Sequence, residues 1–405
     1  MAACRASEGN IFNLADEILM DILSRLPHKR LIMCKVVSKK FHRLVSTLIH
    51  SPTRPRPFSG LFNLQMVYRR YPAFFRYLRK VEIGEIGLNI VMNDGLSFLP
   101  CHPNTRVHDI RDGFLLCSTN NRHEYYVCNP FTRQWVHLPR PPKRYGNCNI
   151  ELSALVLDEP SDVFFCCHYK VVEFATTHGR TPHSYLDIML DPSKGWEEKI
   201  PLDLNVCVYS SRTGQWVESN ACLKDIKFYM LEEKSSVFVN GALFFPAFFP
   251  ANPSQVLMFD LKEEYFKLLD LPTDMLISSF IQCGCLGESE GCLTCACHNG
   301  SEMGVWKIDG VDSDWVLMRK IDLNDFGLPD DWKDAQDPLN IVAVHPNLDD
   351  VFLRSHKHLF RYYRYDINSR ELKMLFSSYY NMSLEINPFS ECLCSLADAH
   401  RRIQQ

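Results

Sequence analysis

Soft metal ligands are concentrated in one short part of this chain of 405 residues. They are Cys283, Cys285, Cys292, Cys295, Cys297 and His298. Thiolate and imidazole groups at this density can hold zinc, and a hairpin turning at residues 288–291 would bring the two groups of ligands together. The sequence therefore offers a candidate metal centre, which depends on the strands that carry the thiols.

The strand that carries most of these thiols belongs to a repeat. In each copy an acidic or amide residue and a glycine precede an apolar phrase. The three copies begin at Asp112-Gly113, Asn240-Gly241 and Glu290-Gly291. Cys295 then takes the position of Cys117 and Phe245, which is typical of a core where a thiol serves as a small hydrophobe. We therefore predict that the chain binds no metal, and no cofactor is expected.

A second repeated phrase places a polar turn residue six positions before a large apolar residue. The pairs are Asn129 and Trp135, Ser210 and Trp216, Asp260 and Phe266, Asp309 and Trp315, and Asp366 and Leu372. Apolar residues flank each turn, as in a β-hairpin, and two hairpins per unit make a four-stranded blade. Repeats of about 50 residues with four strands predict a β-propeller, here with roughly five to seven blades.

The first interval between these anchors is longer than the others. Residues 152–157 and 186–190 are interpreted as strands of one blade with long loops. Residues 58–101 are expected to supply a further blade, and residues 392–396 a closing strand. The fold predicted for residues 58–400 is an all-β, β-propeller-like domain.

The N-terminal part of the chain has helical rather than alternating periodicity. Residues 13–27 place their apolar side chains on one stripe at about 100° per residue. This stripe consists of Ile18, Leu19, Ile22, Leu23 and Leu26. Asn13 or Asp16 can cap the helix, and Pro27 ends it. About forty residues with this much apolar surface cannot bury it all internally, so part of it should meet a partner.

Four features of this module form a specific pattern. Leu14 precedes an acidic pair, the helix ends in Leu26-Pro27, a basic residue precedes Leu31, and Val37-Ser38-Lys39-Lys40-Phe41 follows. The pattern resembles an F-box, the segment by which a substrate receptor docks on the SKP-type adaptor of a cullin-based ubiquitin ligase. The alternative is a helical cap packed on the chain's own main domain, because both arrangements leave the same apolar stripe.

The F-box resemblance implies a three-helix module at residues 10–50. It further implies that six residues face the adaptor or support the helices that do: Leu14, Ile18, Leu23, Pro27, Val37 and Phe41. Ala15 and Phe41 stand where the family usually has Pro and Trp, and both keep their positions apolar. Residues 51–57 hold three prolines and are expected to form an extended, semi-rigid linker.

Composition limits the environment and the ligands. With 44 basic and 48 acidic residues the net charge is −4, which makes no case for nucleic acid as a partner. Seventeen scattered cysteines predict reduced thiols in the cytoplasm or nucleus. No secretory signal is visible, and the most apolar stretch, residues 241–250, is shorter than the roughly 20 residues that a membrane span needs.

Residues 126–135, 239–243 and 303–306 resemble phrases of the F-box-associated, kelch-like domain that follows the F-box in many plant proteins. Both resemblances together imply an α+β multidomain chain that is not an enzyme. Its implied function is that of the substrate-recognition subunit of an SCF-type cullin ubiquitin ligase. The implied partners are an SKP-type adaptor, cullin through that adaptor, and an unidentified target protein. The alternative is a carbohydrate-binding or carbohydrate-processing β-propeller.

Long breaks between repeat strands are the candidate ligand loops, because binding residues concentrate on loops held by a rigid scaffold. They are residues 140–149, 176–183, 246–254 and 322–338. The third carries Phe248 and Phe249 between prolines. Large apolar groups at a surface usually mark a contact, although these two could also fold back under the blade.

The thiol interpretation predicts a response to chelation. Protein prepared without added metal should hold no stoichiometric zinc by elemental analysis, and a chelator should leave its Tm unchanged, because the thiols stabilise the core by packing. Release of bound zinc together with loss of fold would contradict this interpretation.

Overall fold

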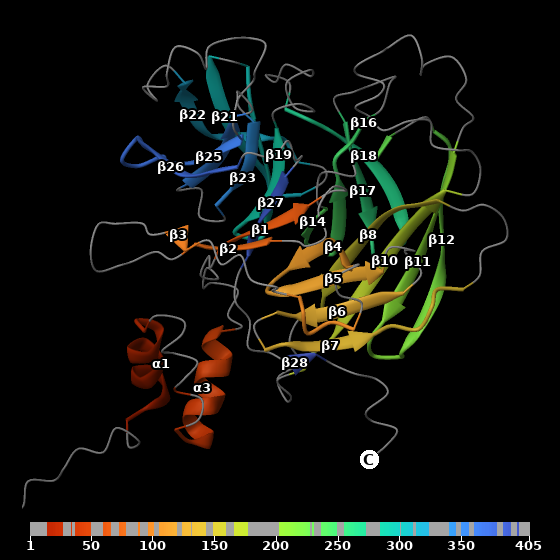
Figure 1. Ribbon diagram of the computed structural model, residues 1–405, viewed down its shortest axis with the longest axis horizontal. Helices are drawn as coiled ribbons and strands as arrows, with labels where there is room; N and C mark the ends of the chain where they lie inside the picture. The colour runs from red at the N-terminus through yellow and green to blue at the C-terminus, as the bar shows by residue number, and fades with distance from the viewer. Residues whose placement is uncertain are drawn as a thin grey trace, which may run out of the picture. The chain divides into compact units, whose positions relative to one another are not determined.

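The structure, a computed structural model, divides the chain into two compact units, residues 1–57 and residues 58–405 (Figure 1). It describes residues 14–26, 34, 37–49, 60–65, 73–77, 88–89, 96–100, 105–119, 124–130, 132–142, 149–158, 166–176, 202–226, 229–230, 236–248, 255–272, 284–299, 301–310, 313–323, 340–345, 350–355, 360–378, 384–389 and 395–396.

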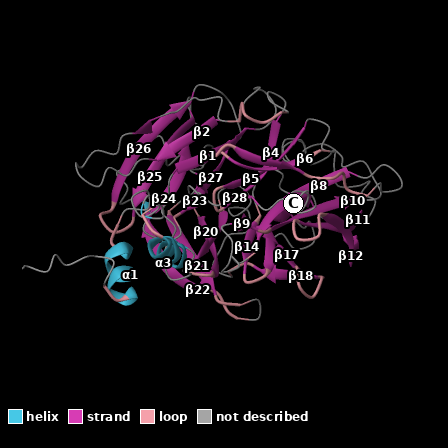
Figure 2. Cartoon of the chain, turned by 90° about the horizontal axis from the view of Figure 1, so that it is seen from below, coloured by secondary structure: helices cyan, strands magenta, loops and turns pink. Residues whose placement is uncertain are grey.

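The first unit contains helices α1 (Asp16–Ser24) and α3 (Lys39–Ile49), drawn in cyan in Figure 2. Their apolar faces pack together into a small core. Its buried members are Leu19, Leu23, Phe41, Leu44, Val45 and Leu48. Between the helices, residues 27–33 and 35–36 lie outside the described part of the chain, as does linker 51–57. Neither α1 nor α3 is long and apolar enough to cross a membrane.

The second unit contains six four-stranded sheets within its described residues, so the predicted β-propeller is confirmed. We call the sheets blades and number them along the chain. Blade 1 holds β4 (Thr105–Arg111), β5 (Phe114–Thr119), β6 (Tyr125–Asn129) and β7 (Gln134–His137). Blade 2 holds β8 (Asn149–Leu157), β10 (Tyr169–Thr176), β11 (Leu202–Ser210) and β12 (Gln215–Ile226). Blade 3 holds β14 (Val237–Val239), β15 (Ala242–Phe245), β17 (Gln255–Asp260) and β18 (Tyr265–Asp270).

The remaining blades follow the same plan, in which neighbouring strands pair antiparallel. Blade 4 holds β19 (Cys285–Ser289), β20 (Cys292–His298), β21 (Glu302–Ile308) and β22 (Val316–Asp322). Blade 5 holds β23 (Asn340–Val344), β24 (Asp350–Ser355), β25 (Phe360–Asp366) and β26 (Glu371–Ser378). Blade 6 holds β27 (Leu384–Phe389), β1 (Gly60–Gln65), β2 (Ala73–Tyr77) and β3 (Leu88–Asn89). A two-stranded sheet pairs β13 (Tyr229–Met230) with β16 (Ala247–Phe248).

Blade 6 closes the ring with strands from both ends of this unit. β27 pairs antiparallel with β1, with Leu384 opposite Gln65 and Phe389 opposite Gly60. β27 also contacts β23 of blade 5 and β4 of blade 1. The prediction that residues 392–396 close the ring is wrong. Residues 395–396 instead form β28 (Ser395–Leu396), which pairs parallel with β9 (Cys166–Cys167).

The two repeated turn phrases are confirmed as the two hairpins of a blade. Asn240 and Gly241 both have positive φ, 48° and 85°, as a two-residue type I′ hairpin requires. Asp112-Gly113 and Glu290-Gly291 likewise have positive φ at both residues. In the second phrase all five polar residues lie at the turn between the third and fourth strands of blades 1 to 5. The predicted strand at 186–190 lies outside the described residues, and the second strand of blade 2 is β10, which the periodicity did not reveal.

Tryptophans of the second phrase tie blades to their neighbours. The Nε1–H group of Trp216 donates to the carbonyl oxygen of Pro139 at 2.7 Å, and Trp315 donates in the same way to Asp270 at 2.8 Å. Each acceptor follows or ends the outer strand of the preceding blade. The same residue therefore fills an apolar gap between blades and satisfies a backbone carbonyl there.

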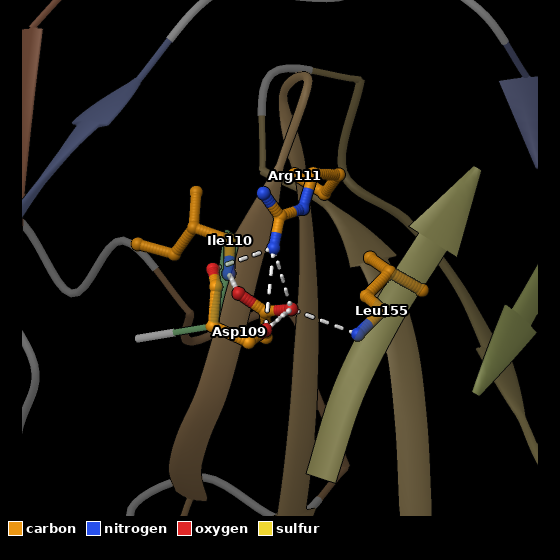
Figure 3. A network of polar contacts seen from close by, with 5 residues as sticks. Asp109, Ile110, Arg111 and Leu155 are labelled. Carbon is orange, nitrogen blue, oxygen red and sulfur yellow. Dashed lines mark hydrogen bonds and ion pairs between the residues drawn. The ribbon is translucent and has the colours of Figure 1, made fainter. Parts of the chain in front are cut away.

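A buried carboxylate joins the first three blades near their innermost strands (Figure 3). Asp109 in β4 is 1% exposed, and a β-bulge next to it shifts the register of β4 against β5. Its Oδ1 accepts the N–H of Ile110, and its Oδ2 accepts the N–H of Leu155 in β8, both at 2.8 Å. Arg111 Nη2 lies 3.3 Å from Oδ2 and donates at 2.8 Å to the carbonyl of Ser236, which precedes β14.

Burial raises the pKa of Asp109, and the charge of Arg111 and the two backbone N–H groups oppose that rise. The carboxylate therefore accepts from its own strand, from the next blade and, at 3.4 Å, from the hydroxyl of Ser236, whose carbonyl accepts from the Arg111 guanidinium. A buried polar group with its partners in place specifies one arrangement of the strands that supply them.

Removing this carboxylate should loosen the propeller. Asp109→Ala removes the negative partner of a largely buried guanidinium and the acceptor of the Leu155 N–H, so we expect a loss of about 3 kcal/mol in the free energy of unfolding. Glu124→Ala is the matched control, because Glu124 pairs with Arg140 at 2.7 Å in the same blade but at the surface. The control should cost less than about 1 kcal/mol. Equal effects in urea denaturation would contradict the assignment.

Candidate functional site

Three large apolar residues are exposed among the described residues of the helical unit. Ile18 is 51% exposed, Ile22 41% and Val37 52%. Ile18 and Ile22 lie one helical turn apart in α1, at the edge of the apolar stripe whose Leu19 and Leu23 are buried in the core with α3. These exposed residues beside a packed core give the described part of the unit a surface suited to apolar contact.

The six residues predicted for adaptor binding divide into three groups. Ile18 and Val37 are exposed and available for contact. Leu23 and Phe41 are buried in the core, so they can only support the helices, and Leu14 packs against that core while half-buried. Pro27 lies outside the described residues. Ile22 was in the sequence's apolar stripe but not among the six, and its exposure adds it to the candidate surface.

Charged groups surround the start of α1. The ammonium of Lys40 lies 3.1 Å from Asp16 Oδ1 and donates to the carbonyl of Leu14 at 2.8 Å. Arg43 Nη2 lies 2.6 Å from Asp16 Oδ2. The hydrogen bond from Lys40 is the main cause that lowers the pKa of Asp16. These contacts join the start of α1 to α3.

The thiols proposed as metal ligands lie in two separate cores. Cys295 and Cys297 pack with Trp306 in the core shared with blade 3, whereas Cys285 packs in the core shared with blade 5. Cys292 lies beside the hairpin turn and donates to Asp309 Oδ1 at 2.6 Å. Cys283 lies outside the described residues, within which no three His, Cys, Asp or Glu side chains form a metal-binding group.

Close packing explains why these positions hold small residues. The Trp306 ring lies over Gly304, where an added Cβ would come within 2.1 Å of the ring. Burial raises the pKa of Cys292, and the hydrogen bond to Asp309 acts in the same direction. In this structure the Cys292 thiol is therefore held as a hydrogen-bond donor to Asp309.

The predicted ligand loops are largely outside the described residues, and nothing there tests them. Phe248 belongs to β16, where it pairs with Tyr229 of β13, and Phe249 lies outside the described part. The apolar surface of the helical unit is therefore the functional site that the geometry supports best.

Comparisons with known proteins agree with both units. Residues 11–50 match the F-box domain model. Residues 96–363 match the family model described as "F-box protein At3g26010-like, beta-propeller". These matches correspond to the helical unit and to most of the propeller.

Curated relatives come from Arabidopsis thaliana. The chain is 24% identical to F-box protein At5g49610 over 76% of this chain and 79% of that protein. It is 26% identical to F-box protein At5g07610 over 78% and 72%, and 25% identical to F-box protein At3g26010 over 86% and 76%. The chain thus has an N-terminal F-box followed by a β-propeller, and it belongs to the At3g26010-like β-propeller family of F-box proteins.

Proposed function

We propose that this chain is the substrate-recognition subunit of an SCF-type cullin ubiquitin ligase. The observation that carries the proposal is the exposure of Ile18, Ile22 and Val37 on an F-box whose helices α1 and α3 bury their other apolar residues against each other. An apolar helix face of this kind suits a groove on a partner protein, and the SKP-type adaptor is the partner that an F-box implies. Cullin is reached through that adaptor.

The propeller would hold the target. A receptor of this kind makes and breaks no bonds itself, and it acts by raising the effective concentration of the target near the ubiquitin-charged enzyme. We place this activity in the cytoplasm or nucleus. The inter-blade loops, with Phe248 and Phe249 as first candidates, are the proposed target site, since loops on a rigid scaffold carry most binding residues.

Substituting an exposed apolar residue separates docking from folding. Ile22→Asp should weaken binding to a purified SKP-type adaptor by more than about tenfold, because docking would bury an unpaired carboxylate, while the Tm of the free chain stays unchanged. The matched control is Val217→Asp, at a residue exposed on β12 of the propeller. Leu23→Asp, in contrast, should lower stability, because Leu23 is 2% exposed. Wild-type adaptor affinity in a folded Ile22→Asp variant would overturn the proposal.

The target site is tested by the double variant Phe248→Ser with Phe249→Ser. We expect it to lose the proteins that co-purify with the wild-type chain when the proteasome is inhibited, while adaptor binding and Tm are retained. A loss of several kcal/mol in stability would instead show that the two rings are core residues. Unchanged capture would move the site to another loop, with residues 322–338 examined next.

A further inference from the structure

Helix α1 begins without the side-chain cap expected from its sequence. The residue at its N-cap position is Ala15, with φ −59° and ψ 150°, and no side chain there accepts a backbone N–H. Asp16 is therefore the first residue of the helix rather than its cap, and Asn13, the other expected cap, lies outside the described residues. Helix α3 begins differently, since Ser38 Oγ accepts the N–H of Phe41 at 3.2 Å.

The start of α1 is held from α3 instead. Lys40 projects from the first turn of the capped helix and contacts the carbonyl of Leu14 at 2.8 Å and Asp16 Oδ1 at 3.1 Å. The Lys40 ammonium thus binds the chain on both sides of Ala15. Arg43 adds a contact to the other carboxylate oxygen of Asp16, but its side chain is 69% exposed against 31% for Lys40. Screening by solvent makes the Arg43 contact the weaker of the two.

The exposed Ile18 lies in the first turn of α1, which these Lys40 contacts stabilise. The amide of Leu19 makes the first hydrogen bond of α1, to the carbonyl of Ala15 at 3.1 Å. A helix end without a cap frays, and fraying of this turn would move Ile18 out of place. Part of the binding free energy would then be lost to ordering this turn.

We propose that Lys40 is a positioning residue for adaptor docking: it holds the first turn of α1 so that Ile18 is presented in place. The inference rests on the proposed function. Lys40 acts through Leu14 and Asp16, not by touching the adaptor. Its effect on overall stability is small, because the buried core of Leu19, Leu23, Phe41 and their neighbours stabilises the unit.

The test compares Lys40→Met with Lys39→Met in the full chain. Lys39 is the adjacent, exposed lysine of α3, so both variants lose one positive charge from the same helix. For Lys40→Met we expect adaptor affinity to fall about twofold to fivefold, the range that a partly exposed ionic contact supports, with no change in Tm. In the free chain, hydrogen exchange at the Leu19 amide should be faster in the Lys40→Met variant than in the wild type. Lys39→Met should change neither quantity, and Lys40→Arg should restore both.

The outcomes separate this inference from the proposed function. Hydrogen exchange at the Leu19 amide is measured without adaptor, so it tests whether Lys40 stabilises the first turn of α1 independently of docking. A wild-type chain that binds no SKP-type adaptor would overturn the proposed function but not this structural role of Lys40. Equal Leu19 exchange and equal affinity in the two methionine variants would overturn the positioning role. A fall in Tm for Lys40→Met alone would also overturn it, because Lys40 would then be a residue of general stability.

Discussion

The arrangement of the first three blades depends on the hydrogen bonds and the ion pair of the buried Asp109 carboxylate. This carboxylate is buried where the inner strands of a ring come close together, and its partners come from β4, from β8 and, through Arg111, from the residue before β14. Burying a charge is costly unless its partners are placed correctly. The same cost makes the network selective, because a shift of any one of these strands would leave the carboxylate or the guanidinium unsatisfied.

Farther from the axis, the blades are joined by packing and by single hydrogen bonds. Trp216 and Trp315 reach carbonyls of the preceding blade, and between blades 1 and 2 the hydroxyl of Tyr125 donates to Glu173 at 2.8 Å. The buried thiols of blade 4 fall on both faces of that blade, where they pack among the apolar side chains shared with blades 3 and 5.

The two units handle their apolar residues in different ways. The propeller buries large side chains between blades, and the large apolar residues exposed in its described part lie singly or as a neighbouring pair on outer strands. The F-box instead keeps Ile18, Ile22 and Val37 at its surface and holds its first helix with Lys40 rather than with a local cap. Such an arrangement suits a module whose apolar surface stays exposed for contact with a partner and is already ordered before binding.

Local chemistry in the sequence was enough to determine the hairpins and the helix. Asn240-Gly241 specifies a turn because both residues tolerate positive φ, and the stripe from Ile18 to Leu26 specifies a helix through its spacing. Only tertiary structure decided which residues of that stripe stay exposed, since Leu23 and Ile22 are equally apolar and differ only in whether α3 covers them. The same holds for ring closure: β27 pairs with β1 across more than 300 residues, and no local pattern encodes a partner so far away in the chain.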